Sequence, residues 1–426
     1  MLRRTRIAKI IGIVLILAGG TAFASPHSAK EFGAKGNGVA DDTAALQAAI
    51  DASTRGADPG ELLIPAGIYR VSKTLVVNKV SGVTIRGEGS MGIGVPKEPS
   101  DFKQNGTLLI WVGPDGGTLL KVIGTGAMTY RDLALCGRDR RDAKQKGRAG
   151  ILFHAVAPPG LGNMINRISG LSFTDAGVGL QMGGGTEDMA NTDSDILMEF
   201  LTFRELTTGM KVKHMQGVNY RITFLFGLAC DTVLHFEEGG NVMADNMQMT
   251  GCKLVVRIDR GCRNSGTYLF NNLRVEGFGA GNVMRSQILK CNPKEQATVR
   301  FINYDDVQWW WSTVKDPVQR YVPLCEIGPG STVVFETSIF NSPLARLTGD
   351  KGHPARLIVR ESHFNYVKPQ DSLVADEFGY FKTLDCSDHD GGNILPDLIK
   401  WPRLETINLP PEAKHYGKDL VPPAQP

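Results

Sequence analysis

The chain has 426 residues, of which 42% are hydrophobic, and its 50 glycines suit the tight turns of a folded protein rather than a disordered one. Its 47 Lys and Arg residues nearly balance 44 Asp and Glu, so the formal charge is only +3. This balance gives no support for a nucleic-acid partner.

The first 24 residues have the pattern of a secretory signal peptide. Four basic residues precede the apolar run Ile10–Leu17, and a small-residue cleavage site of sequence Ala-Phe-Ala ends at Ala24. The apolar run is too short to span a bilayer. Cleavage after Ala24 changes the formal charge from +3 to −1, because it removes those four basic residues. We therefore expect a secreted or periplasmic protein without membrane contact; an uncleaved anchor is the alternative.

The next segments predict a capped helix followed by strands. Glu31–Ile50 reads EFGAKGNGVADDTAALQAAI, in which a turn at Gly-Asn-Gly precedes a helix that Asp41 or Asp42 would cap. Leu62–Ser72 (LLIPAGIYRVS) predicts two strands around a turn, and Val83–Gly89 (VTIRGEG) predicts a further strand.

These three segments resemble the N-terminal signature of the pectate-lyase superfamily of right-handed parallel β-helix proteins. Its usual form is F-G-A-x-G-D/N-G-x-x-D-D-T-x-A-x-Q-x-A-I, followed by a hydrophobic strand with P-x-G-x-Y. The resemblance covers about residues 30–90 and implies a polysaccharide as substrate or ligand. Polysaccharide lyases, glycoside hydrolases, alginate epimerases and phage tailspikes share the signature, so it does not choose among them. The paired Asp41 and Asp42 are expected to be structural.

Short strand patterns then recur once per coil. Apolar anchors begin at Leu201, Phe224, Met247 and Leu273, at intervals of 23, 23 and 26 residues. Such a repeat predicts a solenoid, because stacked coils bury an apolar face that one coil cannot. We expect an all-β, right-handed parallel β-helix over residues 25–365, with a short N-terminal capping helix. An irregular tail, residues 366–426, is expected to cover its end.

A second set of strands arranges polar residues in two outward columns, because equivalent residues of successive coils lie about 4.8 Å apart. The aligned segments begin at Leu180, Met210, Leu234 and Val256, and their apolar members point inward. The columns are Gln181, Lys211, His235 and Arg257, and then Gly183, Lys213, Glu237 and Asp259.

Such a charged platform suits β-elimination on a uronate polymer. A cation neutralises the C6 carboxylate so that the C5 proton becomes acidic, a base removes that proton, and an acid protonates the leaving oxygen. Lys211, Lys213 and Arg257 are the candidate cations, and His235 or a lysine is the candidate base. The alternative is a solvated surface of paired charges that adds only solubility.

A glycoside hydrolase on the same fold is a second alternative, since Glu237 and Asp259 would lie one coil apart. Asn191-Thr192-Asp193 is similar to a polygalacturonase motif, but the Asp pair, Gly-His-Gly and Arg-Ile-Lys that accompany it in that family are missing. The Asp-Pro-His-Glu motif of alginate epimerases is also missing. A non-catalytic polysaccharide-binding β-helix is a third alternative.

Three further features outside the columns bear on ligands. Trp310 lies in the run Trp309–Trp311 and would either stack on a sugar ring or pack in the core. Asp306 is a candidate substrate contact, as is Gln181 of the first column. The loop 183–188 contains two carboxylates that suit Ca²⁺, or is simply a flexible loop. No other cofactor is predicted.

The seven cysteines include no C-x-x-C pair, so the sequence does not support a zinc site. Cys230 and Cys252 are 22 residues apart, about one coil, and would form either a disulfide or a pair of buried thiols. Association into a homotrimer is compatible with the fold, since β-helix proteins often associate side by side.

Overall fold

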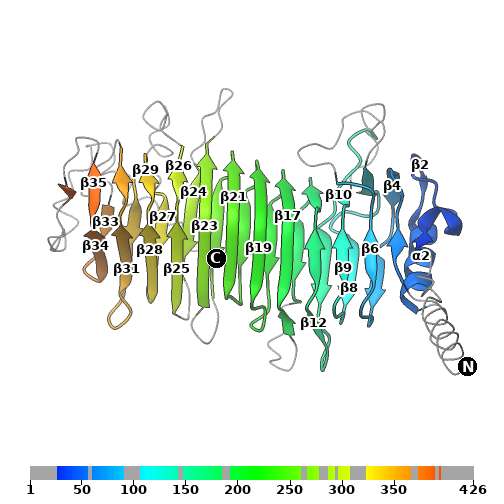
Figure 1. Cartoon of the computed structure of the whole chain (residues 1–426), viewed down its shortest axis with the longest axis horizontal. Coiled ribbons are helices and arrows are strands. Elements are labelled where there is room, and N and C mark those ends of the chain that lie inside the picture. The colour runs from blue at the N-terminus through cyan, green and yellow to red at the C-terminus, as the bar shows by residue number, and fades with distance from the viewer. Residues whose placement is uncertain are drawn as a thin grey trace, which may run out of the picture.

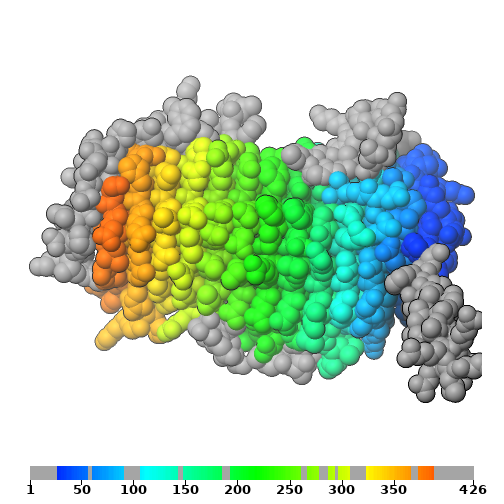
Figure 2. Space-filling model, in the orientation of Figure 1, coloured from blue at the N-terminus to red at the C-terminus, as the bar shows by residue number. Residues whose placement is uncertain are grey.

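The computed structural model describes residues 26–55, 60–90, 106–142, 147–184, 192–260, 266–277, 286–292, 296–307, 323–365, 373–388 and 393–394. Parallel strands stack in chain order along one axis, from the N-terminal cap at one end to β35 at the other (Figure 1). In Figure 2 successive coils lie against one another from the blue to the orange end. The predicted right-handed parallel β-helix is confirmed. Within the described residues, no helix is long and apolar enough to cross a membrane.

The N-terminal cap contains the short 3₁₀ helix η1 (Ala29–Phe32) and the helix α2 (Thr43–Arg55). The carboxylate of Asp42 accepts hydrogen bonds from the backbone N–H groups of Lys35 (2.6 Å) and Gly36 (3.1 Å). Asp41 accepts one from the N–H of Thr43 at 3.0 Å. Both aspartates therefore fix the backbone that leads into the helix, as the sequence predicted.

The described strands form one sheet of 23 strands, one of 11 and one of two. The large sheet contains β1 (His27–Ser28), β2 (Asn37–Asp41), β3 (Leu62–Leu63), β4 (Gly67–Val71), β6 (Thr84–Arg86), β7 (Thr107–Trp111), β9 (Thr129–Arg131), β10 (Ala134–Cys136), β13 (Arg167–Ser169), β14 (Ser172–Thr174), β17 (Ile196–Arg204), β19 (Tyr220–Leu228), β21 (Val242–Thr250), β23 (Gly266–Glu276), β25 (Ala297–Ile302), β26 (Asp305–Asp306), β28 (Ser331–Glu336), β29 (Ile339–Phe340), β31 (Ala355–Arg360), β32 (His363–Phe364), β34 (Gly379–Leu384), β35 (Cys386–Asp388) and β36 (Asn393–Ile394).

The second sheet carries the candidate site. It contains β5 (Leu75–Asn78), β8 (Thr118–Ile123), β11 (Ile151–Val156), β15 (Val178–Met182), β18 (Thr208–Val212), β20 (Thr232–Phe236), β22 (Leu254–Ile258), β24 (Gln287–Cys291), β27 (Cys325–Ile327), β30 (Ala345–Leu347) and β33 (Leu373–Ala375). The two-stranded sheet consists of β12 (Gly162–Met164) and β16 (Thr192–Ser194).

The register between coils corrects one predicted anchor. Leu201 pairs with Leu225, Leu225 with Met247, and Met247 with Leu273. Phe224 lies one position earlier, at a corner where the backbone is left-handed (φ 58°), and its side chain is 47% exposed. The extra residue at the corner shifts the inward positions by one, so Phe224 is wrong as a core anchor.

The left-handed corner recurs from coil to coil and forms a column, here called the corner column. Its aligned residues all have positive φ: Asp132, Gly170, Phe200, Phe224, Asn246 and Asn272. Asparagine and glycine tolerate this conformation, whereas it is unusual for a bulky aromatic residue. Asn272 Nδ2 donates to Asn246 Oδ1 at 3.1 Å, so amide side chains link two of these coils.

The strands continue beyond the boundary predicted at residue 365. β34 pairs in parallel with β31, and β35 pairs in parallel with β32. The parallel β-helix therefore extends to Asp388, because the apolar pattern of β34 still fills an inward position after a long insertion. The predicted signal segment and residues 395–426 lie outside the described residues.

The cysteines predicted to be neighbours do lie on adjacent coils. Cys230 and Cys252 are both buried thiols rather than a disulfide. Cys262 lies outside the described residues.

Stacked aromatic rings fill the interior of the later coils. Phe301 lies between Phe270, with ring centroids 5.2 Å apart, and Phe335, at 4.8 Å. All three side chains are fully buried. Each ring therefore packs on both faces along the axis of the solenoid.

Replacing Phe301 by alanine should lower the free energy of unfolding by about 3–5 kcal/mol, because it leaves a cavity between two rings. The midpoint of urea unfolding measures this effect. The 77% exposed Val39 supplies the control, since Val39→Ala should change stability by less than about 0.5 kcal/mol. Equal midpoints for the two variants would contradict this packing.

A buried carboxyl group lies between β12 and β16. Asn163 donates its Nδ2 hydrogen to Asp193 Oδ1 at 2.7 Å, and Asn163 Oδ1 accepts from the N–H of Thr125 at 2.9 Å. Asp193 is fully buried, and burial raises its pKa to about 7, although the hydrogen bond from Asn163 opposes the increase. Asp193 is therefore part of the interior, and Asn191 of the same motif lies outside the described residues.

The raised pKa of Asp193 predicts that stability falls with increasing pH. The folded state keeps the proton up to about pH 7, whereas the unfolded chain loses it near pH 3.8, so folding becomes less favourable across that window. The loss amounts to about 4 kcal/mol. Urea midpoints at pH 5 and pH 8 should converge in Asp193→Asn relative to wild type. The exposed Asp51→Asn is the control, and an unaltered pH dependence in Asp193→Asn would contradict the prediction.

Candidate functional site

The first predicted column exists in the register of the second sheet. Gln181 pairs with Lys211, Lys211 with His235, and His235 with Arg257. Each strand alternates buried apolar residues with one less buried polar residue. Hydrogen bonding between coils therefore brings residues that are 22 to 30 positions apart into one row.

The column is longer than the sequence indicated. Lys121 pairs with His154 and His154 with Gln181, while Arg257 pairs with Lys290 and Lys290 with Glu326. The pattern Phe153-His154-Ala155 matches the other platform strands and could have revealed this extension. Long insertions on either side hid the repeat interval.

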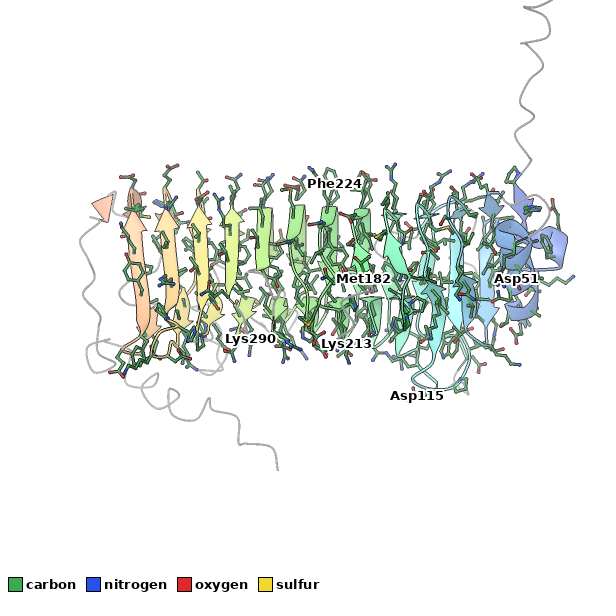
Figure 3. The ribbon with its side chains drawn as sticks, turned by 90° about the horizontal axis from the view of Figure 1, so that it is seen from below. Asp51, Asp115, Met182, Lys213, Phe224 and Lys290 are labelled. Carbon is green, nitrogen blue, oxygen red and sulfur yellow. The ribbon has the colours of Figure 1, made fainter. Side chains whose placement is uncertain are left out.

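Both columns lie on one long edge of the molecule. Lys213 and Lys290 project together from this edge, whereas Phe224 projects from the opposite edge (Figure 3). In Figure 3 Met182, from β15 of the same sheet, lies between the two edges. The polar columns thus have their own surface of the solenoid.

Glu237 joins the two lysines of the platform. Its carboxylate lies 2.5 Å from Lys211 Nζ and 3.5 Å from Lys213 Nζ. Burial alone would raise the pKa of Glu237, but the hydrogen bond and charge of Lys211 outweigh burial and lower it. Glu237 is therefore ionised at neutral pH and offsets part of the lysine charge.

Asp259 joins His235 and Arg257 in the same way. Asp259 Oδ2 lies 2.8 Å from His235 Nε2, and Arg257 Nε donates to Asp259 Oδ1 at 2.8 Å. Burial opposes ionisation of Asp259, but these two hydrogen bonds outweigh it and lower its pKa to about 2. An ionised Asp259 accepts a proton from Nε2 of His235, which leaves Nδ1 as the ring atom that can take up a proton.

Gln181 and His154 form a smaller polar contact at the start of the platform. Gln181 Nε2 donates to the carbonyl oxygen of Gly183 at 3.1 Å and lies 3.1 Å from His154 Nε2. Burial and the nearby charge of Lys121 lower the pKa of His154, while the contact with Gly183 O opposes this. His154 is therefore neutral at neutral pH, and Gln181 holds the backbone after β15.

The arrangement places a carboxylate-oriented imidazole between two cations. Lys211 and Arg257 are the paired neighbours of His235 on the preceding and following coils. A ligand carboxylate above His235 would reach both cations, each about 4.8 Å from it along the axis. The ligand must compete with Glu237 and Asp259 for them, so net attraction is weaker than an unpaired column would give.

The other predicted contacts fare differently. Asp306 is fully buried, and its carboxylate accepts a hydrogen bond from the backbone N–H of Asn341 at 3.0 Å. This burial argues against contact between Asp306 and substrate, and it arises because Asp306 occupies the inward position of β26. Trp310 and the two carboxylates of the loop 183–188 lie outside the described residues. Among the described residues, no group of three His, Cys, Asp or Glu side chains could hold a metal ion.

Known proteins resemble this chain over limited segments. Mannuronan C5-epimerase AlgE1 of Azotobacter vinelandii is 59% identical over 46 residues, which cover 11% of this chain and 3% of AlgE1. Mannuronan C5-epimerase AlgE4 of the same organism is 37% identical over 131 residues, covering 28% of this chain and 21% of AlgE4. The chain thus spans less than a quarter of the length of either curated relative.

A solved structure resembles most of the chain. The pre-mature gene product 12 of bacteriophage phi29 has a TM-score of 0.51 and 13% identity, and the likeness covers 90% of this chain and 54% of that one. At this level of identity the likeness shows a shared fold alone.

A protein family matches the chain more broadly. Residues 27–257 match the family described as rhamnogalacturonase A/epimerase, pectate lyase-like. This range is more than half of the 426 residues and includes the cap and the platform as far as Arg257. The chain therefore belongs to the rhamnogalacturonase A/epimerase, pectate lyase-like family.

Proposed function

We propose that the chain is a carbohydrate-active enzyme that cleaves an acidic, uronate-containing polysaccharide by β-elimination. The observation that carries this proposal is the position of His235, which contacts Asp259 and lies between Lys211 and Arg257 in one row. The printed names of similar proteins, mannuronan C5-epimerase and alginate lyase, support a uronate polymer as substrate.

In the proposed reaction, Lys211 and Arg257 bind the C6 carboxylate and stabilise the negative charge that develops when C5 loses its proton. His235 Nδ1 takes the C5 proton, and the electrons of that bond form a C4–C5 double bond. The C4–O bond breaks, and the departing oxygen receives a proton from Lys213 or from His235. Asp259 orients the imidazole and stabilises its charged form.

The two carboxylates of the platform fit hydrolysis less well. A glycosidase needs one carboxyl group that stays protonated and acts as the general acid, and this requires a raised pKa. The pKa values of Glu237 and Asp259 are both lowered. Elimination is therefore favoured over hydrolysis at this pair.

Epimerisation is a second candidate function, because two similar proteins bear the name C5-epimerase. Both reactions begin with removal of the C5 proton. They differ in whether the sugar is reprotonated or the C4–O bond breaks.

The N-terminal pattern supports the further proposal of export to the periplasm or the exterior after cleavage behind Ala24. A Ca²⁺ ion bound by the loop 183–188, and lateral association into a homotrimer, are retained as proposals.

Wild-type protein incubated with alginate, polygalacturonate and other uronate polymers should produce the ultraviolet absorbance of an unsaturated uronate. New reducing ends without that absorbance would instead indicate hydrolysis, and a changed uronate ratio in an intact polymer would indicate epimerisation. If all of the polymers remain unchanged, the proposal of an enzyme acting on uronates is contradicted.

His235→Ala should reduce kcat by about 10²- to 10⁴-fold, because it removes the base that accepts the C5 proton. His353→Ala is the matched control, since His353 also contacts an aspartate, Asp350, at 2.9 Å, but belongs to an exposed turn away from the platform. Initial rates of product formation measure the difference. Equal rates for His235→Ala and wild type would exclude His235 as the base.

Asp259→Asn should reduce kcat by about 10²-fold, because a neutral amide no longer orients and stabilises the charged imidazole. Asp231→Asn serves as the control, since Asp231 also forms an ion pair, 2.5 Å from Lys253, in an exposed turn. Thermal midpoints of both variants should lie close to wild type, because both carboxylates are partly exposed. Unchanged turnover in Asp259→Asn would show that the histidine acts without it.

A further inference from the structure

Two phenylalanines of the corner column are exposed and stacked on each other. Phe200 and Phe224 have ring centroids 4.9 Å apart and an interplanar angle of 4°. They are 59% and 47% exposed, and both have left-handed backbones, with φ of 55° and 58°. Strain of this kind in an exposed aromatic pair points to a role other than packing.

The stacked pair belongs to a surface separate from the platform. Phe224 projects from the edge opposite to Lys213 and Lys290 (Figure 3). The two surfaces are formed by different sheets, since β17 and β19 pair in the large sheet. The pair therefore cannot serve as part of the platform.

One face of the aromatic stack borders a layer without a side chain. Gly170 aligns with Phe200, because Ser169 pairs with Glu199 and Ser172 pairs with Thr202. On the other side of Phe224, the next residue of the column is Asn246. Phe200 has glycine as its neighbour where Phe224 has asparagine, which agrees with its larger exposure.

The far side of the glycine layer is polar. Asp132 aligns with Gly170, and a Cβ atom added to Gly170 would lie 2.9 Å from Asp132 Oδ1, with no atom of Phe200 among its three nearest neighbours. The coils of Asp132 and Phe200 are two rises apart, or about 9.6 Å. An aromatic face and a carboxylate thus border the same layer from opposite sides.

Charged pairs surround the layer and nearly cancel. Arg131 lies 3.0 Å from Asp132, and Arg167 lies 2.5 Å from Glu199, the residue before Phe200. These side chains offer both donors and acceptors to a ligand but no net charge. A flat ligand with one apolar face and several hydroxyl groups matches this combination better than an anion, a lipid or an apolar segment of a second copy.

We propose that the Gly170 layer of the corner column binds one pyranose ring of a polysaccharide, stacked on Phe200 and hydrogen-bonded through its hydroxyl groups to Asp132. The ring takes the place of the missing side chain and continues the stack of Phe224 and Phe200. This second contact shares the class of ligand with the proposed function, but it uses none of the platform residues.

Two substitutions test the proposal without disturbing the coil. Phe200→Asn replaces the aromatic face by the residue that the column uses at Asn246 and Asn272, and asparagine tolerates the left-handed backbone. Gly170→Asn fills the layer while keeping both rings, and it displaces only the mobile end of the Asp132 side chain. The control is Ile339→Asn, which removes a 40% exposed apolar residue from β29.

Isothermal titration with cellohexaose and with a mannuronate hexamer measures binding, using His235→Ala protein so that neither probe is consumed. We expect binding of at least one hexamer, a loss of affinity of about tenfold in both Phe200→Asn and Gly170→Asn, and no loss in Ile339→Asn. Thermal midpoints should be unchanged or higher in Phe200→Asn, because the strained aromatic residue is gone.

The proposal is overturned if both variants bind as tightly as the parent, or if the parent binds neither hexamer. It is also overturned if sedimentation shows a dimer that Phe200→Asn dissociates, since the occupant would then be a second copy of the chain. Failure of the proposed function would look different: wild type would leave uronate polymers unchanged while hexamer binding still depended on Phe200.

Discussion

Hydrogen bonds between parallel strands of successive coils fix which residues become neighbours in this molecule. Because the register is kept from one coil to the next, a side chain near position 181 lies beside one near 211 and another near 235. The buried apolar residues on the other face of each strand maintain that register, since a slip by one residue would expose them. The candidate site therefore depends on the core of the solenoid as much as on its own charges.

Compensation of charge is the second constraint on the platform. The carboxylates of Glu237 and Asp259 hold Lys211 and His235 in fixed positions, and each carboxylate is kept ionised by the cations around it. An unpaired row of cations would attract an anionic polymer more strongly but would hold its side chains less well. The observed arrangement favours orientation over attraction, which suits a site that must place a base beside one particular proton.

The sequence predicted the repeat, the inward and outward alternation, and the column from Gln181 to Arg257, because these follow directly from a short periodic pattern. It did not predict Lys121 and His154 as members, because insertions separate their coils from the regular block. It also placed Phe224 in the core, since nothing in the local pattern distinguishes an extra corner residue from a strand residue. Asp306 was expected at the surface for a similar reason: adjacent aspartates do not reveal which one points inward.

The account as a whole rests on a bound uronate lying across the platform with its carboxylate between Lys211 and Arg257. A crystal structure of the His235→Ala variant with a uronate oligosaccharide tests this most directly, because the substitution preserves the ligand. The account predicts that the C6 carboxylate of one sugar contacts both cations and that C5 faces the space vacated by the imidazole. An oligosaccharide bound only elsewhere on the solenoid, with Lys211 and Arg257 still paired to Glu237 and Asp259, would contradict it.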